Sequence, residues 1–184
     1  MDVNPGKKSW VVGSGGGDTF TLYVRDALGI STPTADAIPR LTPPVPRVDD
    51  PEATERVTRG WDRWWEQSLP SPGSQHVRGR WPVGLPEHLH DAFLQWSGDP
   101  SSPETTRQRD EDRQQFSELL NEVIDQLTDE LGHPPLFSLS MIEIPVEGQF
   151  WRRLSKDTVL VSENLKRSRN VIAPLESVIR DLAE

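Results

Sequence analysis

The chain has 184 residues, a net charge of −9 and no cysteine. Its length suits a single domain over residues 1–184, and the lack of cysteine excludes a disulfide scaffold, a cysteine-ligated zinc site and a thiol nucleophile. The negative charge argues against general nucleic-acid binding, because neutralising phosphates requires a basic surface.

The N-terminal residues MDVNPGKKSW lack the apolar core of a signal peptide. No stretch of the sequence approaches the run of about 18 apolar residues that a membrane span needs. We therefore expect a cytoplasmic protein that makes no contact with a membrane.

The first elements are predicted from residues 8–28. KSWVV at 8–12 predicts a short strand that runs into a glycine-rich loop at 13–18. Over 18–28 the apolar residues fit both the alternation of a strand and the spacing of a helix. We prefer the helix, because Asp18 can cap its start and Gly29 suits a left-handed residue at its end.

A strand, a glycine loop and a helix N-terminus in this order can present backbone N–H groups to an anion. The sequence therefore predicts a small-ligand site at Ser14, Gly15, Gly16, Asp18 and Thr19. The match to known loops is incomplete, because Asp18 replaces the last glycine of GxGxxG and would repel a phosphate. A plain flexible turn is the alternative.

Two proline-rich segments separate the next helices. Residues 30–51 contain six prolines and predict an extended connector, and residues 70–86 predict a Pro/Gly-rich loop. Between them a helix is predicted from Asp50 to Leu69, with Pro51 at its first position.

This helix carries Trp61, Trp64 and Trp65 on one face. Such a slab of indoles has to be covered, either by the core of this chain or by a partner, and the sequence leaves both open. As partner-binding candidates we name these three tryptophans together with Arg152 and Arg153.

Three more helices are predicted further along. A short one covers residues 86–96, and a long one runs from Pro103 to Leu131 and stops at Gly132. Residues 105–115 of the long helix have no apolar stripe, so we expect them to project into solvent or to be disordered. A last helical region covers 163–183 and is divided at Pro174.

The period changes to two after Pro135, which predicts strands at 137–146, 148–154 and 158–162. The short connections predict antiparallel pairing. Glu143 is then expected on the solvent side, paired with Arg152 or Arg153. The predicted fold is α+β, with a small antiparallel sheet of these three strands, which an N-terminal strand can extend, packed against several helices.

The function expected first is an intracellular protein-protein interaction module, such as an adaptor or a neutralising protein. It would use the excess aromatic surface together with an acidic segment at 99–130 and a basic segment at 152–169. The alternative is a small-ligand or anion-binding domain, or an enzyme, built on the loop at 13–18. The partner is expected to be another protein or a second copy of the chain. We assign no catalytic residue, metal ligand or cofactor.

Overall fold

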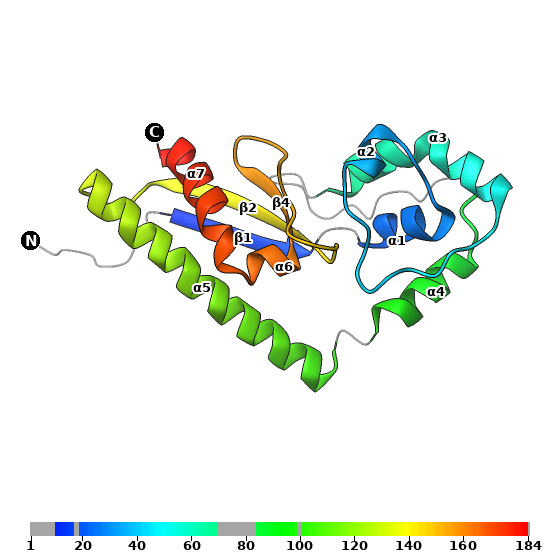
Figure 1. Cartoon of the computed structure of the whole chain (residues 1–184), viewed down its shortest axis with the longest axis horizontal. Coiled ribbons are helices and arrows are strands. Elements are labelled where there is room, and N and C mark those ends of the chain that lie inside the picture. Colours follow the sequence, from blue (N-terminus) through cyan, green and yellow to red (C-terminus); the bar gives the residue numbers. More distant parts are fainter. Residues whose placement is uncertain (1–9, 17–18, 70–83, 99–100, 184) are drawn as a thin grey trace, which may run out of the picture.

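The computed structural model describes residues 10–16, 19–69, 84–98 and 101–183 (Figure 1). They form a four-stranded sheet packed against helices, so the predicted α+β class is confirmed. The strands are β1 (Trp10–Gly16), β2 (Phe137–Ile144), β3 (Trp151–Arg153) and β4 (Thr158–Ser162), and their order in the sheet is β1-β2-β4-β3.

The sheet is mixed, and the predicted antiparallel pairing holds for only one pair of strands. β2 pairs in parallel with both β1 and β4, while β3 and β4 are antiparallel. The prediction treated strands that follow each other in sequence as neighbours in the sheet. Residues 145–157 instead connect β2 to a parallel β4, and about a dozen residues are enough for such a crossover. β3 lies within this connection and takes the outer edge of the sheet.

Local sequence signals place most of the helices correctly. The longer ones are α1 (Thr19–Leu28), α3 (Pro51–Ser68), α4 (His88–Ser97), α5 (Pro103–Leu131) and α7 (Ile172–Ala183); α2 (Pro33–Asp36) and α6 (Glu163–Lys166) are single turns. The helix preferred for 18–28 is confirmed. The side chains of Asp50 and Ser102 cap α3 and α5 by accepting backbone N–H groups, and Gly132 ends α5 with a φ of 75°.

The last helical region is interrupted earlier than predicted. The break lies at Arg167 and Ser168, between α6 and the 3-10 turn η1 (Arg169–Val171), and not at Pro174. Pro174 lies in the first turn of α7, where its missing N–H removes no helical hydrogen bond.

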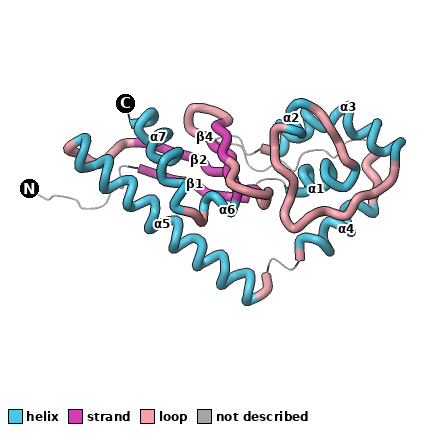
Figure 2. The backbone as a smooth tube through the Cα atoms, in the orientation of Figure 1, coloured by secondary structure: helices cyan, strands magenta, loops and turns pink. Residues whose placement is uncertain are grey.

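The two faces of the sheet contribute to two hydrophobic cores. Leu139, Met141 and Val159 pack with α5 and α7, which cover one face. Ile142 and Leu160 pack with α1, α3 and α4. These three helices gather beyond the carboxyl ends of β1 and β2 (Figure 2). None of the helices in the described ranges has the length and apolar character needed to cross a bilayer.

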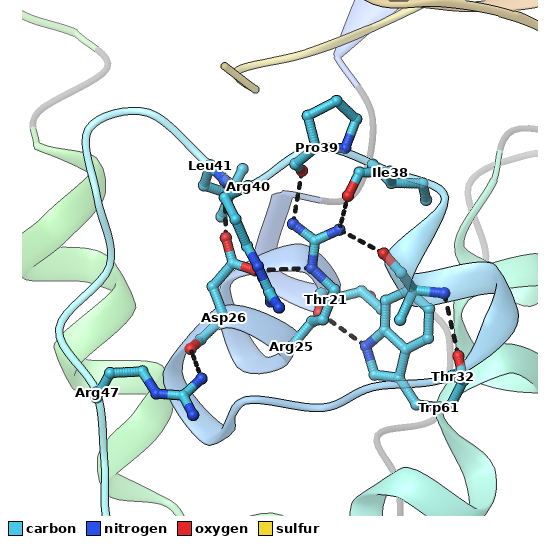
Figure 3. A network of polar contacts seen from close by, with 11 residues as sticks. Thr21, Arg25, Asp26, Thr32, Ile38, Pro39, Arg40, Leu41, Arg47 and Trp61 are labelled. Carbon is cyan, nitrogen blue, oxygen red and sulfur yellow. Dashed lines mark hydrogen bonds and ion pairs between the residues drawn. The ribbon is translucent and has the colours of Figure 1, made fainter.

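The connector at 30–51 is held against α1 by the buried side chain of Arg25 (Figure 3). Its guanidinium donates to Asp26 at 2.7 Å and to the carbonyl oxygens of three connector residues, Ala35, Ile38 and Pro39. The connector is therefore fixed by side-chain hydrogen bonds to its backbone, with α2 as its one helical turn.

Candidate functional site

A cleft of about 810 Å³ lies between the sheet and α5. Its floor comes from β1 and from the end of β2, through Trp10, Val12, Glu143 and Pro145, and Thr19 lines it at the start of α1. α6 supplies the second wall through Glu163, Lys166 and Arg167. The cleft thus extends from the start of β1 to the carboxyl end of β2.

The wall from α5 is one continuous face of the helix. Its cleft residues recur at alternating spacings of three and one, as residues on one side of a helix do; they are Arg109, Asp112, Arg113, Phe116, Ser117, Leu120 and Asn121. The buried stripe of α5 begins at Phe116. Before this residue the same face carries charged side chains, so the part of α5 without an apolar stripe forms the charged wall of the cleft.

The two ends of the cleft differ in chemistry. α5 runs roughly opposite to β1, so its later turns lie beside the start of the strand (Figure 1). Trp10 and Val12 therefore share the apolar end with Phe116 and Leu120. Most of the charged side chains lie at the other end, where β2 ends and α1 begins.

Lys166 is the most enclosed cation of the cleft, with 11 % of its side chain exposed. Its Nζ donates to Glu143 Oε1 at 2.5 Å and lies 4.8 Å from the centroid of the Phe116 ring. The sequence-based expectation that Glu143 pairs with Arg152 or Arg153 is therefore wrong. The reason is that the Glu143 side of β2 faces the cleft, where α6 places Lys166 next to it, and the side chain of Glu143 is only 27 % exposed.

Arg167 links α6 to α5. Its Nη2 lies 2.8 Å from Asp112 and 3.3 Å from Glu163. Burial raises the pKa of the Glu163 carboxyl; the nearby Arg167 opposes this effect, and the carboxylates of Glu143 and Asp112 add to it. Glu163 is thus the carboxyl group of the cleft that holds a proton more readily than usual.

The glycine-rich segment has a different structure from the loop we predicted. β1 continues through Gly16, so Ser14, Gly15 and Gly16 are strand residues paired with Met141, Ile142 and Glu143. Parallel backbone pairing with β2 overrides the turn tendency of the glycines. Of the predicted ligand residues, Thr19 lines the cleft, and Asp18 lies outside the described residues.

The predicted partner-binding residues do not gather in one place. Trp61, Trp64 and Trp65 are 0, 3 and 3 % exposed and belong to the core around α1 and α3. Trp61 stacks on Trp65 and donates from Nε1 to the carbonyl oxygen of Thr21 at 3.1 Å. Of the two alternatives for the tryptophan slab, burial in this chain is the one observed.

Arg152 and Arg153 lie on opposite faces of β3. Arg152 is exposed and pairs with Leu160 of β4 through the backbone. Arg153 bonds Asp181 of α7 at 2.7 Å and the carbonyl oxygen of Lys156 at 2.6 Å. It therefore fastens the turn between β3 and β4 to the last helix.

Within the described ranges, the acidic and histidine side chains form no group of three that could hold a metal ion. No family model, curated protein or solved structure was found to match the chain. The candidate site therefore rests on the geometry of this structure alone.

Most cleft residues were not singled out from the sequence. A usable signal existed on α5, where Arg109, Asp112 and Arg113 continue the helical spacing of Phe116 and Leu120 in charged residues. No local pattern pointed to Lys166 or Glu163, because their position depends on how β4 returns to the sheet.

Proposed function

We propose that this protein is a small-ligand-binding domain and that the cleft between β1, α5 and α6 is its binding site. The volume of about 810 Å³ falls within the roughly 300 to 1,000 Å³ of typical small-molecule sites. An apolar end and a charged end within one cleft also match the usual composition of such sites.

The observation that carries this proposal is the charged part of α5 that borders the cleft. Arg109, Asp112 and Arg113 line the cleft together with Phe116; Asp112 is half-buried, and the two arginines are exposed at the cleft mouth. Charged side chains facing a hollow can select a ligand by its charge, while those on the outer face cannot.

This proposal places the ligand site beside the segment expected from the sequence, although the segment is a strand. Thr19 is common to the expected and the proposed site. The proposal assigns ligand binding only and names no reaction, because the cleft contains no pair of residues that we can order as nucleophile and base.

The test is a thermal-shift screen of small organic anions, cations and neutral compounds. A ligand at 100 times its dissociation constant stabilises a protein by about 2.7 kcal/mol, which gives a clear shift of the melting temperature. Ser117→Trp, on the exposed rim of the cleft, should strongly reduce the shift by obstructing the cleft.

Gln114→Trp is the matched control, because Gln114 is an exposed neutral residue of α5 that does not line the cleft. This variant should keep the ligand shift of the wild type. A screen without any hit, or a shift that survives Ser117→Trp, would rule out the cleft as the binding site.

A second candidate is the interaction module, with a second copy of the chain as partner. Its support is an uncharged part of the sheet face opposite α5, where Val11 and Leu136 are 61 and 66 % exposed. Val11 pairs with Ser138 of β2, which is exposed too. Two copies with a charge of −9 each repel one another least where both surfaces are uncharged.

Sedimentation equilibrium tests this candidate. The wild type should show a concentration-dependent dimer that Leu136→Lys abolishes by placing like charges in a symmetric contact. Leu94→Lys, at a residue of α4 that is 53 % exposed, is the control and should dimerise as the wild type does. A wild type that stays monomeric at high concentration rules the candidate out.

A further inference from the structure

We propose that the ligand of the cleft is a short, uncharged peptide in an extended conformation, which pairs with the outer edge of β1 as a fifth strand of the sheet. This inference rests on the proposed ligand-binding function and specifies the chemical class of the ligand. Three features of the structure support it: the open edge of β1, the side chains that β1 turns into the cleft and the ion pairs at the charged end.

β1 is an outer strand of the sheet, and one of its edges is open in the described part of the chain. There only β2 pairs with it, and no isolated bridge involves its residues. The outer edge of such a strand presents backbone N–H and C=O groups that can pair with another extended chain. A peptide that lies along this edge would continue the hydrogen bonding of the sheet.

The two outer strands of the sheet differ in how well they are protected against such pairing. β3, at the other edge, has only three residues, and two of them are the charged Arg152 and Arg153. Short length and charge are common means by which an edge strand avoids pairing with another chain. β1 has seven residues, WVVGSGG, with neither a charge nor a proline. The edge of β1 is therefore suited to accept a further strand.

Gly13, in the middle of β1, leaves the strand without a side chain at this position. Gly13 is exposed, and among the described residues an added Cβ would meet only the carbonyl oxygen of Leu139, at the ordinary contact distance of 4.0 Å. The packing of these residues therefore does not require a glycine here. A glycine inside a strand weakens it and often marks a place where another backbone comes close. A bound peptide would supply that backbone.

The cleft can receive the side chains of a strand added at this edge. Trp10 and Val12 line the cleft and are two residues apart, so their side chains point to the same face of the sheet. Side chains directly opposite each other on neighbouring strands also share a face. Every second side chain of the peptide would thus point into the cleft, whose α5 wall carries Phe116 and Leu120 at this end. Apolar side chains fit these positions.

The charged end of the cleft favours a ligand without charge. Its cationic side chains already have partners; the contacts are Lys166–Glu143, Arg167–Asp112, Arg167–Glu163 and Arg113–Asp110, and Arg109 is engaged as well. A charged group of a ligand would have to displace one of these partners, which is costly where the pair is as enclosed as Lys166 and Glu143. A peptide backbone is neutral, and its N–H and C=O groups find their partners on β1.

The probe for the experiment is the peptide acetyl-Thr-Val-Thr-Val-Thr-amide, which is uncharged, consists of strand-forming residues and has valine at alternate positions. Binding is measured by chemical shift perturbation of the backbone amides of the wild-type protein. We expect the largest perturbations along β1 and at the cleft residues of α5.

Two N-methylated isomers of the peptide test the pairing of its backbone. One carries methyl groups on both valine nitrogens, the other on the nitrogens of the last two threonines. Only every second N–H of a strand faces a given neighbour. One isomer should therefore bind at least about tenfold more weakly than the parent peptide, whereas the other should bind about as tightly as the parent.

Val12→Thr and Val11→Thr replace a methyl group by a hydroxyl group on opposite faces of β1. Val12 lines the cleft, so Val12→Thr should weaken peptide binding about three- to fivefold, the effect of about one lost methyl contact. Val11 is 61 % exposed and lies on the other face, where the peptide places its threonines, so Val11→Thr should bind the peptide as the wild type does. Equal losses in the two variants would overturn the placement of the valines in the cleft.

The outcomes separate the inference from the proposed function. Equal affinities of the two N-methylated isomers, or perturbations away from β1 and the cleft, would overturn the pairing with β1. A peptide that does not bind would overturn the inference as well. In each of these cases the small-molecule screen and Ser117→Trp still decide whether the cleft binds a ligand.

Discussion

Arg25 and Arg40 both bond the carboxylate of Asp26, but only Arg25 is enclosed by the protein. The side chain of Arg25 is fully buried, whereas that of Arg40 is 50 % exposed. Arg25→Met would leave Asp26 and three connector carbonyl groups without this donor, and we expect it to lower the free energy of unfolding by about 3 to 5 kcal/mol. Arg40→Met should cost less than about 1 kcal/mol.

Urea denaturation followed by circular dichroism measures both effects. Similar values for the two variants would mean that the connector is held by its apolar contacts, and that the bonds drawn in Figure 3 contribute little.

Glu163 gives the stability a pH dependence with a defined sign. Because burial raises the pKa of this carboxyl, the folded state binds its proton more tightly than the unfolded state. Its contribution to stability is present below the unfolded pKa of about 4.3 and is lost as the pH rises through the folded value. Relative to the wild type, Glu163→Gln should therefore be more stable at neutral pH than at acid pH.

Glu130 is the control of opposite sign. A hydrogen bond from Arg180 lowers its pKa, so it stabilises the fold at neutral pH and loses this effect as the pH falls through the folded pKa. Glu130→Gln should therefore be less stable at neutral pH, relative to the wild type, than at acid pH. Parallel pH profiles of the unfolding free energy for the two variants would contradict at least one of the two assignments.

At the scale of the elements, two glycines should respond in opposite ways to alanine. Gly29 follows α1 with a φ of +68°, and an added Cβ would meet the guanidinium of Arg47. Gly29→Ala should therefore cost at least about 1 kcal/mol. Gly60 lies exposed inside α3 with open space around it, so Gly60→Ala should stabilise by about 0.5 to 1 kcal/mol. Thermal unfolding measures both stability changes. A Gly29→Ala variant as stable as the wild type would mean that Arg47 moves aside and that the backbone strain is small.

The elements also show how far the sequence could predict this structure. Helices followed from signals a few residues apart, such as the Asp50 cap and the Gly132 stop, because each helix makes its own backbone bonds. The strand segments were found from the alternation of apolar residues, which is also a local signal. The order of the strands in the sheet could not be predicted from the sequence, because the pairing of β2 with β4 depends on contacts between segments that are distant in sequence.

The candidate site likewise combines a residue that a local pattern identifies with residues that only the fold brings together. Thr19 was found because a strand, glycines and a helix follow one another in the chain. The cleft is closed by α5 and α6, and its Arg167–Asp112 ion pair joins residues that no local pattern connects. The charged start of α5 was visible in the sequence, but its position beside the cleft became clear only with the fold.

At the scale of the whole molecule, β2 links the two cores. Met141 and Ile142 are adjacent and each 1 % exposed, yet Met141 packs in the core with α5 and α7, and Ile142 in the core with α1 and α3. Neither core can lose its part of β2 without exposing the other. The single domain expected from the chain length thus leads to the prediction that both cores unfold together.

Met141→Ala and Ile142→Ala test this prediction, and each should lower the free energy of unfolding by about 2 to 5 kcal/mol. Tryptophan fluorescence reports on the core that contains Trp61, Trp64 and Trp65 once Trp10 and Trp151, which pack against the other core, are replaced by phenylalanine in all the proteins compared. Far-ultraviolet circular dichroism follows all helices. For both variants the two signals should move to the same lower urea midpoint, although Met141 lies outside the tryptophan core. If Met141→Ala shifted the circular dichroism midpoint and left the fluorescence midpoint unchanged, the two cores would be separate folding units. A ligand in the cleft would then stabilise the sheet and α5 and leave the stability of α3 unchanged.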